Sequence, residues 1–125
     1  MQDGKFVILC IDDEADIRDS LRMVLEPSGY IVEEANGAAT GLEKYTEVNP
    51  DFVLVDMMME KNDSGLTVAT KLKELGNTAP VYMLSSVVDG LVQNMSPQDL
   101  GLTGVFQKPV DPEVLLTSLK TRLKA

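Results

Sequence analysis

The stretch FVILCIDD, at residues 6–13, decides the class of fold. Its first six residues are all apolar, without alternation, which is typical of a strand buried on both faces of a parallel sheet. The run stops at two acids, Asp12 and Asp13. The same arrangement returns at residues 52–56, FVLVD, where four apolar residues are followed by Asp56. Buried strands that stop at acids therefore indicate both the fold and the place of a candidate site.

Helix-like and strand-like patterns alternate from one end of the chain to the other, without an internal repeat or a linker. Further strands are expected at residues 30–35, 81–84 and 105–107, and apolar helical stripes begin at Ile17, Ala38, Leu66 and Leu116. Alternation of this kind predicts an α/β fold with a doubly wound, five-stranded parallel sheet. The flavodoxin-like order 2-1-3-4-5 fits best, because the first, third and fourth strands are the most apolar and should lie centrally.

Composition restricts the possible functions. The chain has 125 residues, which predicts one domain over residues 1–125. Its net charge of −9 disfavours binding to nucleic acid or to anionic membranes. The single cysteine cannot form an internal disulfide, and no apolar run approaches the ~20 residues that span a bilayer. We therefore expect a cytoplasmic protein.

The chain contains no histidine at all. This excludes Ser-His-Asp and Cys-His catalysis, histidine-ligated zinc or haem, and a phosphohistidine on this chain. Any chemistry must use carboxylates, hydroxyls, lysines and hard cations.

The ends of the expected strands place five polar residues on one rim of the sheet. Ligands of open parallel sheets bind outside the carboxyl ends of the strands, where the strand order reverses, here between the first and third strands. Asp12 and Asp13 follow the first strand and Asp56 follows the third. Ser85 follows the fourth strand and Lys108 the fifth, so both should lie on the same rim.

Three carboxylates in one crevice repel one another unless some are protonated or a cation lies between them. Oxygen ligands of this kind favour Mg²⁺ over a soft metal. A remaining carboxylate oxygen can then act as a nucleophile toward phosphorus, giving an aspartyl phosphate. A cation, an ammonium and a hydroxyl around the transferred group are what phosphoryl transfer requires. The pattern therefore predicts a phosphoryl acceptor site.

Four short motifs carry a resemblance to a known family: IDDE at 11–14, VLVD at 53–56, LSS at 84–86 and QKP at 107–109. In this order and spacing they resemble the receiver domain of two-component response regulators, including single-domain chemotaxis regulators. The resemblance covers essentially the whole chain. It implies that Asp56 accepts a phosphoryl group from a sensor histidine kinase or a histidine phosphotransfer protein.

The resemblance also implies roles for the other residues of the rim. Asp12, Asp13 and Asp56 would bind Mg²⁺ together with the backbone carbonyl of Met58. Ser85 and Lys108 would contact the phosphoryl oxygens, and the Lys108–Pro109 bond would be cis. Such a domain is not an enzyme in the usual sense, since it catalyses only its own phosphorylation and dephosphorylation.

One departure from the family pattern affects how a signal could be relayed. Receivers usually have an aromatic residue three positions before the lysine, where this chain has Val105 followed by Phe106. Val105 has a restricted χ1 angle, and Phe106 should face the other side of the sheet. We therefore expect the response to be carried by backbone movement within residues 87–104.

Four alternatives remain open at this stage. Asp12 and Asp13 could merely cap the following helix. A haloacid-dehalogenase-like phosphatase also uses an aspartyl nucleophile, but it has a second acid two residues later, where Met58 stands. A flavin or nucleotide carrier would need a Gly-, Ser- and Thr-rich loop after the first strand instead of acids. The last alternative is a receiver-like binding module that phosphorylation does not regulate.

Overall fold

The computed structural model describes residues 4–57, 65–85, 102–108 and 110–123. The strands are β1 (Val7–Ile11), β2 (Ile31–Ala35), β3 (Phe52–Asp56), β4 (Val81–Ser85) and β5 (Gly104–Gln107). The helices are α1 (Ala15–Leu25), the 3₁₀ turn η1 (Glu26–Ser28), α2 (Ala38–Val48), α3 (Gly65–Glu74) and α5 (Pro112–Arg122). Each expected strand and each of the four expected helices is present among these residues.

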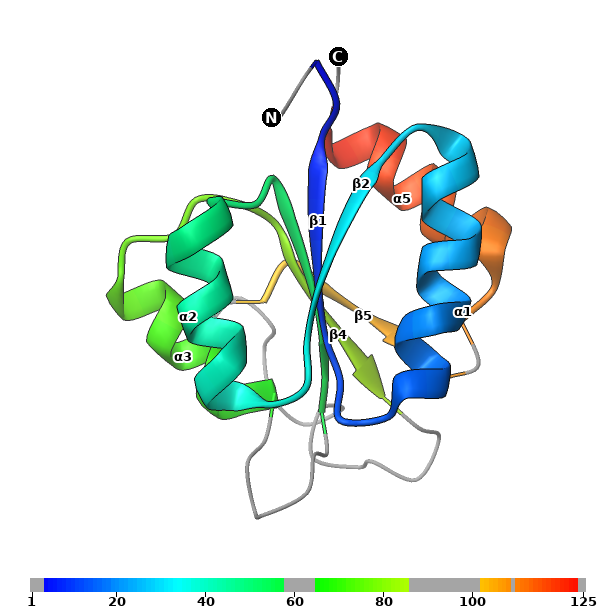
Figure 1. Cartoon of the computed structure of the whole chain (residues 1–125). Helices are drawn as coiled ribbons and strands as arrows, with labels where there is room; N and C mark the ends of the chain where they lie inside the picture. Colours follow the sequence, from blue (N-terminus) through cyan, green and yellow to red (C-terminus); the bar gives the residue numbers. More distant parts are fainter. Residues whose placement is uncertain (1–3, 58–64, 86–101, 109, 124–125) are drawn as a thin grey trace.

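The five strands form one parallel sheet in the order β2-β1-β3-β4-β5, as predicted. Helices α1 and α5 cover one face of the sheet and α2 and α3 the other (Figure 1). β1 and β3 pair side by side, with Ile11 opposite Val55. The carboxyl ends of these two central strands, and the acids there, are thereby brought together.

Two apolar layers hold the helices against the sheet. One lies under α2 and α3 and includes Leu9, Val53 and Met83, and Val105 packs against it. The other lies under α1 and α5 and includes Phe106, which is stacked on Tyr82 at 4.6 Å between ring centroids. Val105 and Phe106 therefore face opposite sides of the sheet, which confirms that Phe106 cannot take the place of Val105.

Local signals in the sequence explain where the helices end. Gly29 has a φ of 95°, a left-handed conformation that glycine adopts without steric cost, and it closes the turn after α1. Asp111 caps α5 by accepting a hydrogen bond from the backbone N–H of Glu113 at 2.8 Å, and Pro112 occupies the first turn. α1 begins differently. Its N-cap is Glu14, whose own side chain makes no capping hydrogen bond. Instead, Asp12 Oδ1 accepts a hydrogen bond from the backbone N–H of Glu14 at 2.9 Å, so Asp12 lies at the start of this helix.

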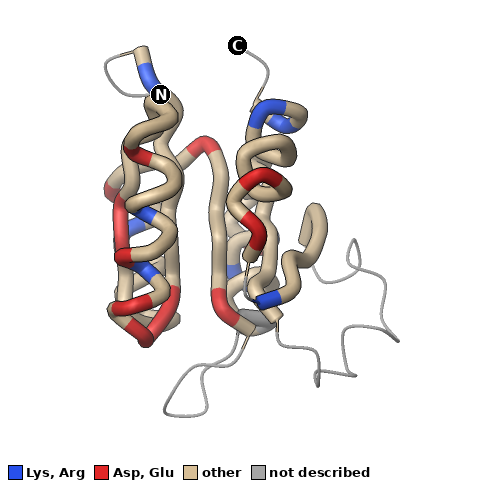
Figure 2. Tube along the Cα trace, turned by 90° about the vertical axis from the view of Figure 1, so that its right-hand side faces the viewer, with Lys and Arg blue, Asp and Glu red and all other residues tan. Residues whose placement is uncertain are grey.

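Edge strand β2 differs from the central strands. Residues of β1, β3 and β4 are buried throughout, whereas β2 has half-buried positions among its buried ones. Acidic residues outnumber basic ones among the described residues, and Figure 2 shows where they lie along the trace. Two of the acids, Glu33 and Glu34, lie on β2, which is polar enough to leave the sheet edge exposed to water.

Candidate functional site

Three acids meet at the carboxyl ends of β1 and β3. Asp12 directly follows β1, Asp13 comes next, and Asp56 is the last residue of β3. One carboxylate oxygen from each lies within 4.8 Å of those of the other two. Asp12 and Asp56 are buried and Asp13 is half-buried. Clustered carboxylates with one partly open member form a donor set that fits a hard cation such as Mg²⁺.

Lys108 completes the cluster from β5. Its Nζ lies 2.8 Å from Asp56 Oδ1 and 3.5 Å from Asp12 Oδ2. Its backbone N–H donates to the carbonyl of Ser85 at 2.7 Å, which fixes the start of the side chain on the rim. Burial lowers the pKa of the Lys108 ammonium, but the hydrogen bond to Asp56 and the charge of Asp12 outweigh it, and the pKa is raised. Lys108 therefore remains a cation at the acidic centre.

Asp12 has a perturbed acidity. Burial raises the pKa of its carboxyl to about 6, opposed by a hydrogen bond from the backbone N–H of Glu14. The nearby charge of Asp56 raises the pKa further and that of Lys108 lowers it. The cause is thus mainly desolvation of a carboxylate, with the neighbouring acid adding to it.

The raised pKa predicts a pH-dependent stability. The Asp12 pKa is about 6 in the fold and 3.8 ordinarily, so the folded state binds the proton more tightly than the unfolded state. The resulting gain in the free energy of unfolding is complete below pH 3.8 and is lost as pH rises through 6. We expect Asp12→Asn, in EDTA, to be up to about 3 kcal/mol more stable than wild type at pH 7.5, since each unit of pKa shift corresponds to about 1.4 kcal/mol. That difference should shrink toward zero at pH 4. Urea unfolding across this pH range measures it.

The exposed Asp19 on α1 offers the matched control. Asp19→Asn removes one negative charge without removing a buried carboxylate, so no comparable gain at pH 7.5 is expected. An Asp12→Asn variant that is equally or less stable than wild type at pH 7.5 would contradict this prediction. It would show that the charged carboxylate of Asp12 does not destabilise the fold.

Ser85 lies on the same rim as the acids. It is the last residue of β4 and is buried, and its Oγ lies 3.8 Å from the sulfur of Met57. The backbone N–H of Met57 donates to the carbonyl of Leu84 at 2.9 Å, so the two strand ends are joined. Met57 is itself buried and belongs to the apolar layer under α2 and α3, so its thioether serves as packing.

Cys10 takes no part in this chemistry. It is fully buried within β1, and burial raises the pKa of its thiol to about 12. A thiol of that acidity is an inert small hydrophobe, as the sequence predicted.

Some expectations fall outside the described residues. Met58, the expected donor of a backbone carbonyl to Mg²⁺, lies there, as does Pro109 and with it the expected cis bond. Most of segment 87–104, the expected carrier of the response, also lies there. These three stay predictions.

Sequence reasoning missed Arg18, whose Nη1 donates to the backbone carbonyl of Asp12 at 2.6 Å. The place of Arg18 on the helix could be predicted from the sequence, but its contact could not. Arg18 lies one residue after Ile17 and four before Arg22, so it stands at the edge of the apolar stripe, in the first helical turn after the acids. Its acceptor is a backbone carbonyl, however. Every residue has one, so the sequence does not show which carbonyl accepts the hydrogen bond.

The family is shown by a match to a family model. The model of the response regulator receiver domain matches residues 8–120, which include all three acids and Lys108. The chain belongs to this family. Receiver domains are typically non-enzymatic modules of two-component signalling, and the acidic centre of this receiver domain is consistent with a phosphoacceptor site.

Curated relatives and solved structures agree with this assignment. The response regulator MprA of Mycobacterium leprae (strain TN) is 33% identical over 117 residues, covering 94% of this chain and 50% of the relative. The receiver domain thus spans about half the length of the curated relatives it matches. A response regulator receiver domain from Clostridium thermocellum has a TM-score of 0.84 at 28% identity, covering 94% of each chain. Vibrio cholerae CheY4, a chemotaxis protein, has a TM-score of 0.85 at 25% identity, covering 95% of this chain and 99% of that one.

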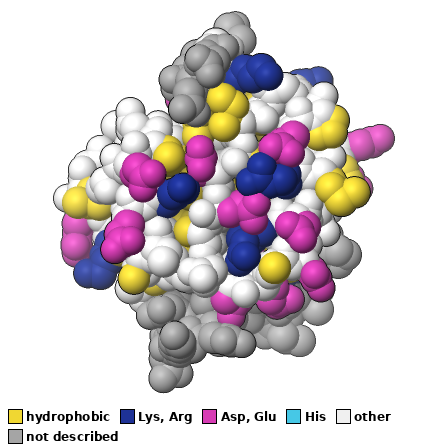
Figure 3. Space-filling model, in the orientation of Figure 1, with side chains coloured by type: hydrophobic (Ala, Val, Ile, Leu, Met, Phe, Trp, Pro, Cys, Tyr) yellow, Lys and Arg dark blue, Asp and Glu magenta, His cyan; other side chains and the backbone are white. Residues whose placement is uncertain are grey.

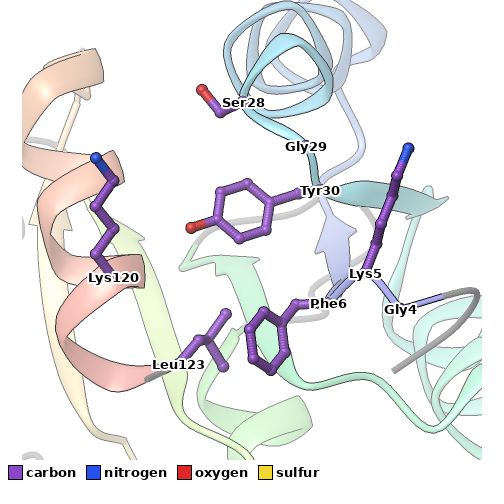
Figure 4. Close-up of a pocket in the computed structure, with 8 residues that line it drawn as sticks. All are labelled: Gly4, Lys5, Phe6, Ser28, Gly29, Tyr30, Lys120 and Leu123. Carbon is purple, nitrogen blue, oxygen red and sulfur yellow. The ribbon is translucent and has the colours of Figure 1, made fainter. Parts of the chain in front are cut away.

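A separate hollow of about 670 Å³ lies at the other end of the sheet (Figure 4). It is lined by Gly4, Lys5, Phe6, Ser28, Gly29, Tyr30, Lys120 and Leu123. Because the strands are parallel, residues that precede β1 and β2 lie at the end of the sheet opposite the acids. The hollow therefore does not belong to the acidic centre of this receiver domain.

Among the described residues, no helix is long and apolar enough to cross a membrane.

Proposed function

We propose that this receiver domain is a phosphoacceptor switch that takes a phosphoryl group onto Asp56 in a Mg²⁺-dependent reaction and then binds its partners differently. The observation that carries the proposal is the pairing of Asp56 Oδ1 with Lys108 Nζ at 2.8 Å inside the cluster of three acids. The cluster unites a nucleophile, a cation site and a fixed ammonium. The donor would be the phosphohistidine of a sensor histidine kinase or a histidine phosphotransfer protein, since this chain has no histidine of its own.

The phosphoryl transfer forms one bond to Asp56 and breaks one bond in the donor. A carboxylate oxygen of Asp56 attacks phosphorus, an oxygen–phosphorus bond forms, and the phosphorus–nitrogen bond of the donor breaks. The bond's electron pair and a proton stay with the departing imidazole. Mg²⁺, held by Asp12, Asp13 and Asp56 with the carbonyl of Met58, would neutralise charge on the phosphoryl oxygens.

Lys108 and Ser85 would hold the transferred group. Lys108 pairs with Asp56 before transfer, and afterwards its ammonium would pair with a phosphoryl oxygen instead. The Ser85 hydroxyl, which faces the sulfur of Met57, would turn to donate to a phosphoryl oxygen. Both contacts exist only with the phosphoryl group, so they supply the differential binding that shifts a switch.

The test is phosphorylation by a small donor. Purified protein is incubated with acetyl phosphate, with Mg²⁺ or with EDTA, and its intact mass is measured. We expect a gain of one phosphoryl group with Mg²⁺ and none with EDTA. If Mg²⁺ gives no gain, the chain is better described as a receiver-like binding module that phosphorylation does not regulate. The expected cytoplasmic location stays a prediction beside this proposal.

A further inference from the structure

The backbone of Asp12 is held by edge strand β2 on one side and by helix α1 on the other. The backbone N–H of Asp12 donates to the carbonyl of Ala35 at 3.1 Å, and its own carbonyl accepts from Nη1 of Arg18 at 2.6 Å. Its side-chain Oδ1 accepts from the backbone N–H of Glu14 at 2.9 Å. Three hydrogen bonds therefore restrict the orientation of Asp12, and one of them comes from a side chain of α1.

Arg18 is itself fixed by β2. Its Nε donates to Glu34 Oε1 at 2.9 Å, and the side chains of Arg18 and Glu34 are only 17% and 24% exposed. Burial raises the pKa of Glu34, but hydrogen bonds from Arg22 and Arg18 outweigh it, and the pKa is lowered. Glu34 is thus a charged anchor that orients the guanidinium of Arg18 toward Asp12. Acidic and basic side chains lie side by side on the face that carries β2 (Figure 3).

Arg22 uses the same anchor without reaching the site. Its Nε donates to Glu34 Oε2 at 2.8 Å, and Nη2 lies 2.6 Å from the same oxygen. Its other described hydrogen bonds go to the carbonyl of Val32 at 3.2 Å and to Glu26 Oε2 at 2.7 Å. Both arginines therefore link α1 to β2 through ion pairs with Glu34. Of the two, Arg18 is the one that also donates to the backbone of Asp12.

We propose that Arg18 is a positioning residue of the acidic centre: anchored on Glu34, it holds the backbone of Asp12 so that the Asp12 carboxylate is preset for Mg²⁺. This rests on the proposed function and deepens it. Groups that orient metal ligands typically change metal affinity by roughly 10–100-fold when removed. A residue that only tied α1 to β2 would change stability without changing metal affinity in the folded protein.

The experiment compares Arg18→Gln with its matched control, Arg22→Gln. Mg²⁺ affinity of each unphosphorylated protein is measured by isothermal titration calorimetry, and stability in EDTA by urea unfolding. Both variants lose ion pairs to Glu34, so both should be destabilised. Only Arg18→Gln should weaken Mg²⁺ binding, by roughly tenfold. Arg18→Lys, which keeps the charge but loses the guanidinium fork, should fall between wild type and Arg18→Gln, and it serves alone if Arg18→Gln does not fold.

Three results would overturn the proposal, and they separate it from the proposed function. If Arg18→Gln and Arg18→Lys bind Mg²⁺ as wild type does, Arg18 is only structural, although the phosphoacceptor proposal stands. Equal losses of Mg²⁺ affinity in the Arg18 and Arg22 variants would assign the effect to the shared tie instead. If the wild-type protein neither binds Mg²⁺ nor gains a phosphoryl group, both proposals fail together.

Discussion

Asp56→Asn should abolish phosphoryl labelling by acetyl phosphate and Mg²⁺. The amide occupies nearly the same space as the carboxylate but lacks the negative oxygen that attacks phosphorus. It also removes one of the three acids around the cation site and the partner of Lys108 at 2.8 Å. The loss should therefore reach the background level seen in EDTA. Intact mass after incubation measures it, with circular dichroism to show that the variant is folded.

Two controls give this result its meaning. Asp19→Asn removes an exposed carboxylate from α1 and should leave labelling unchanged. Peptide mapping of the labelled wild-type protein should place the phosphoryl group on the peptide that contains Asp56. Labelling that persists in Asp56→Asn, with the phosphoryl group mapped to Ser85 for instance, would show that the acceptor is misassigned.

The fold was predictable because its central strands are runs of apolar residues and its helices carry apolar stripes. Burial on two faces leaves a continuous apolar run, whereas burial on one face of a helix leaves a period near 3.6 residues, so the patterns of β1 and α1 differ. Strand order was predictable too, because the polar character of β2 fits only an edge. The exact ends of the strands were less predictable. The sequence places Asp56 and Ser85 just after their strands, but in the structure each residue pairs within the sheet. Backbone ladders do not depend on whether a side chain is apolar, so an apolar pattern can stop one residue before its strand does.

The acidic centre was predictable for a geometrical reason. Parallel strands end at one edge of a sheet, so acids that follow neighbouring strands must lie close together. The contact between Arg18 and the carbonyl of Asp12 was not predictable, because it depends on how α1 lies over β1. The same holds for the shared use of Glu34 by two arginines, which needs β2 and α1 to be placed first.

Asp13→Ala should abolish Mg²⁺-dependent labelling while leaving the fold as stable as wild type in EDTA, or slightly more stable. The acid is half-buried beside Asp12 and Asp56, so its removal relieves repulsion among carboxylates and deprives the cation of a ligand. Asp56 keeps its carboxylate in this variant, so any loss of labelling is due to the cation site. Intact mass after acetyl phosphate treatment measures it.

A second readout separates loss of the cation from loss of the fold. A ligand that binds only the folded state stabilises it by about 2.7 kcal/mol at a concentration one hundred times its Kd. Wild type should therefore unfold at higher urea concentration in saturating Mg²⁺ than in EDTA, whereas Asp13→Ala should unfold at nearly the same concentration in both. Because the variant is compared with itself, this difference does not depend on its own stability. Equal stabilisation of wild type and variant by Mg²⁺, together with unchanged labelling, would exclude Asp13 as a ligand of the cation.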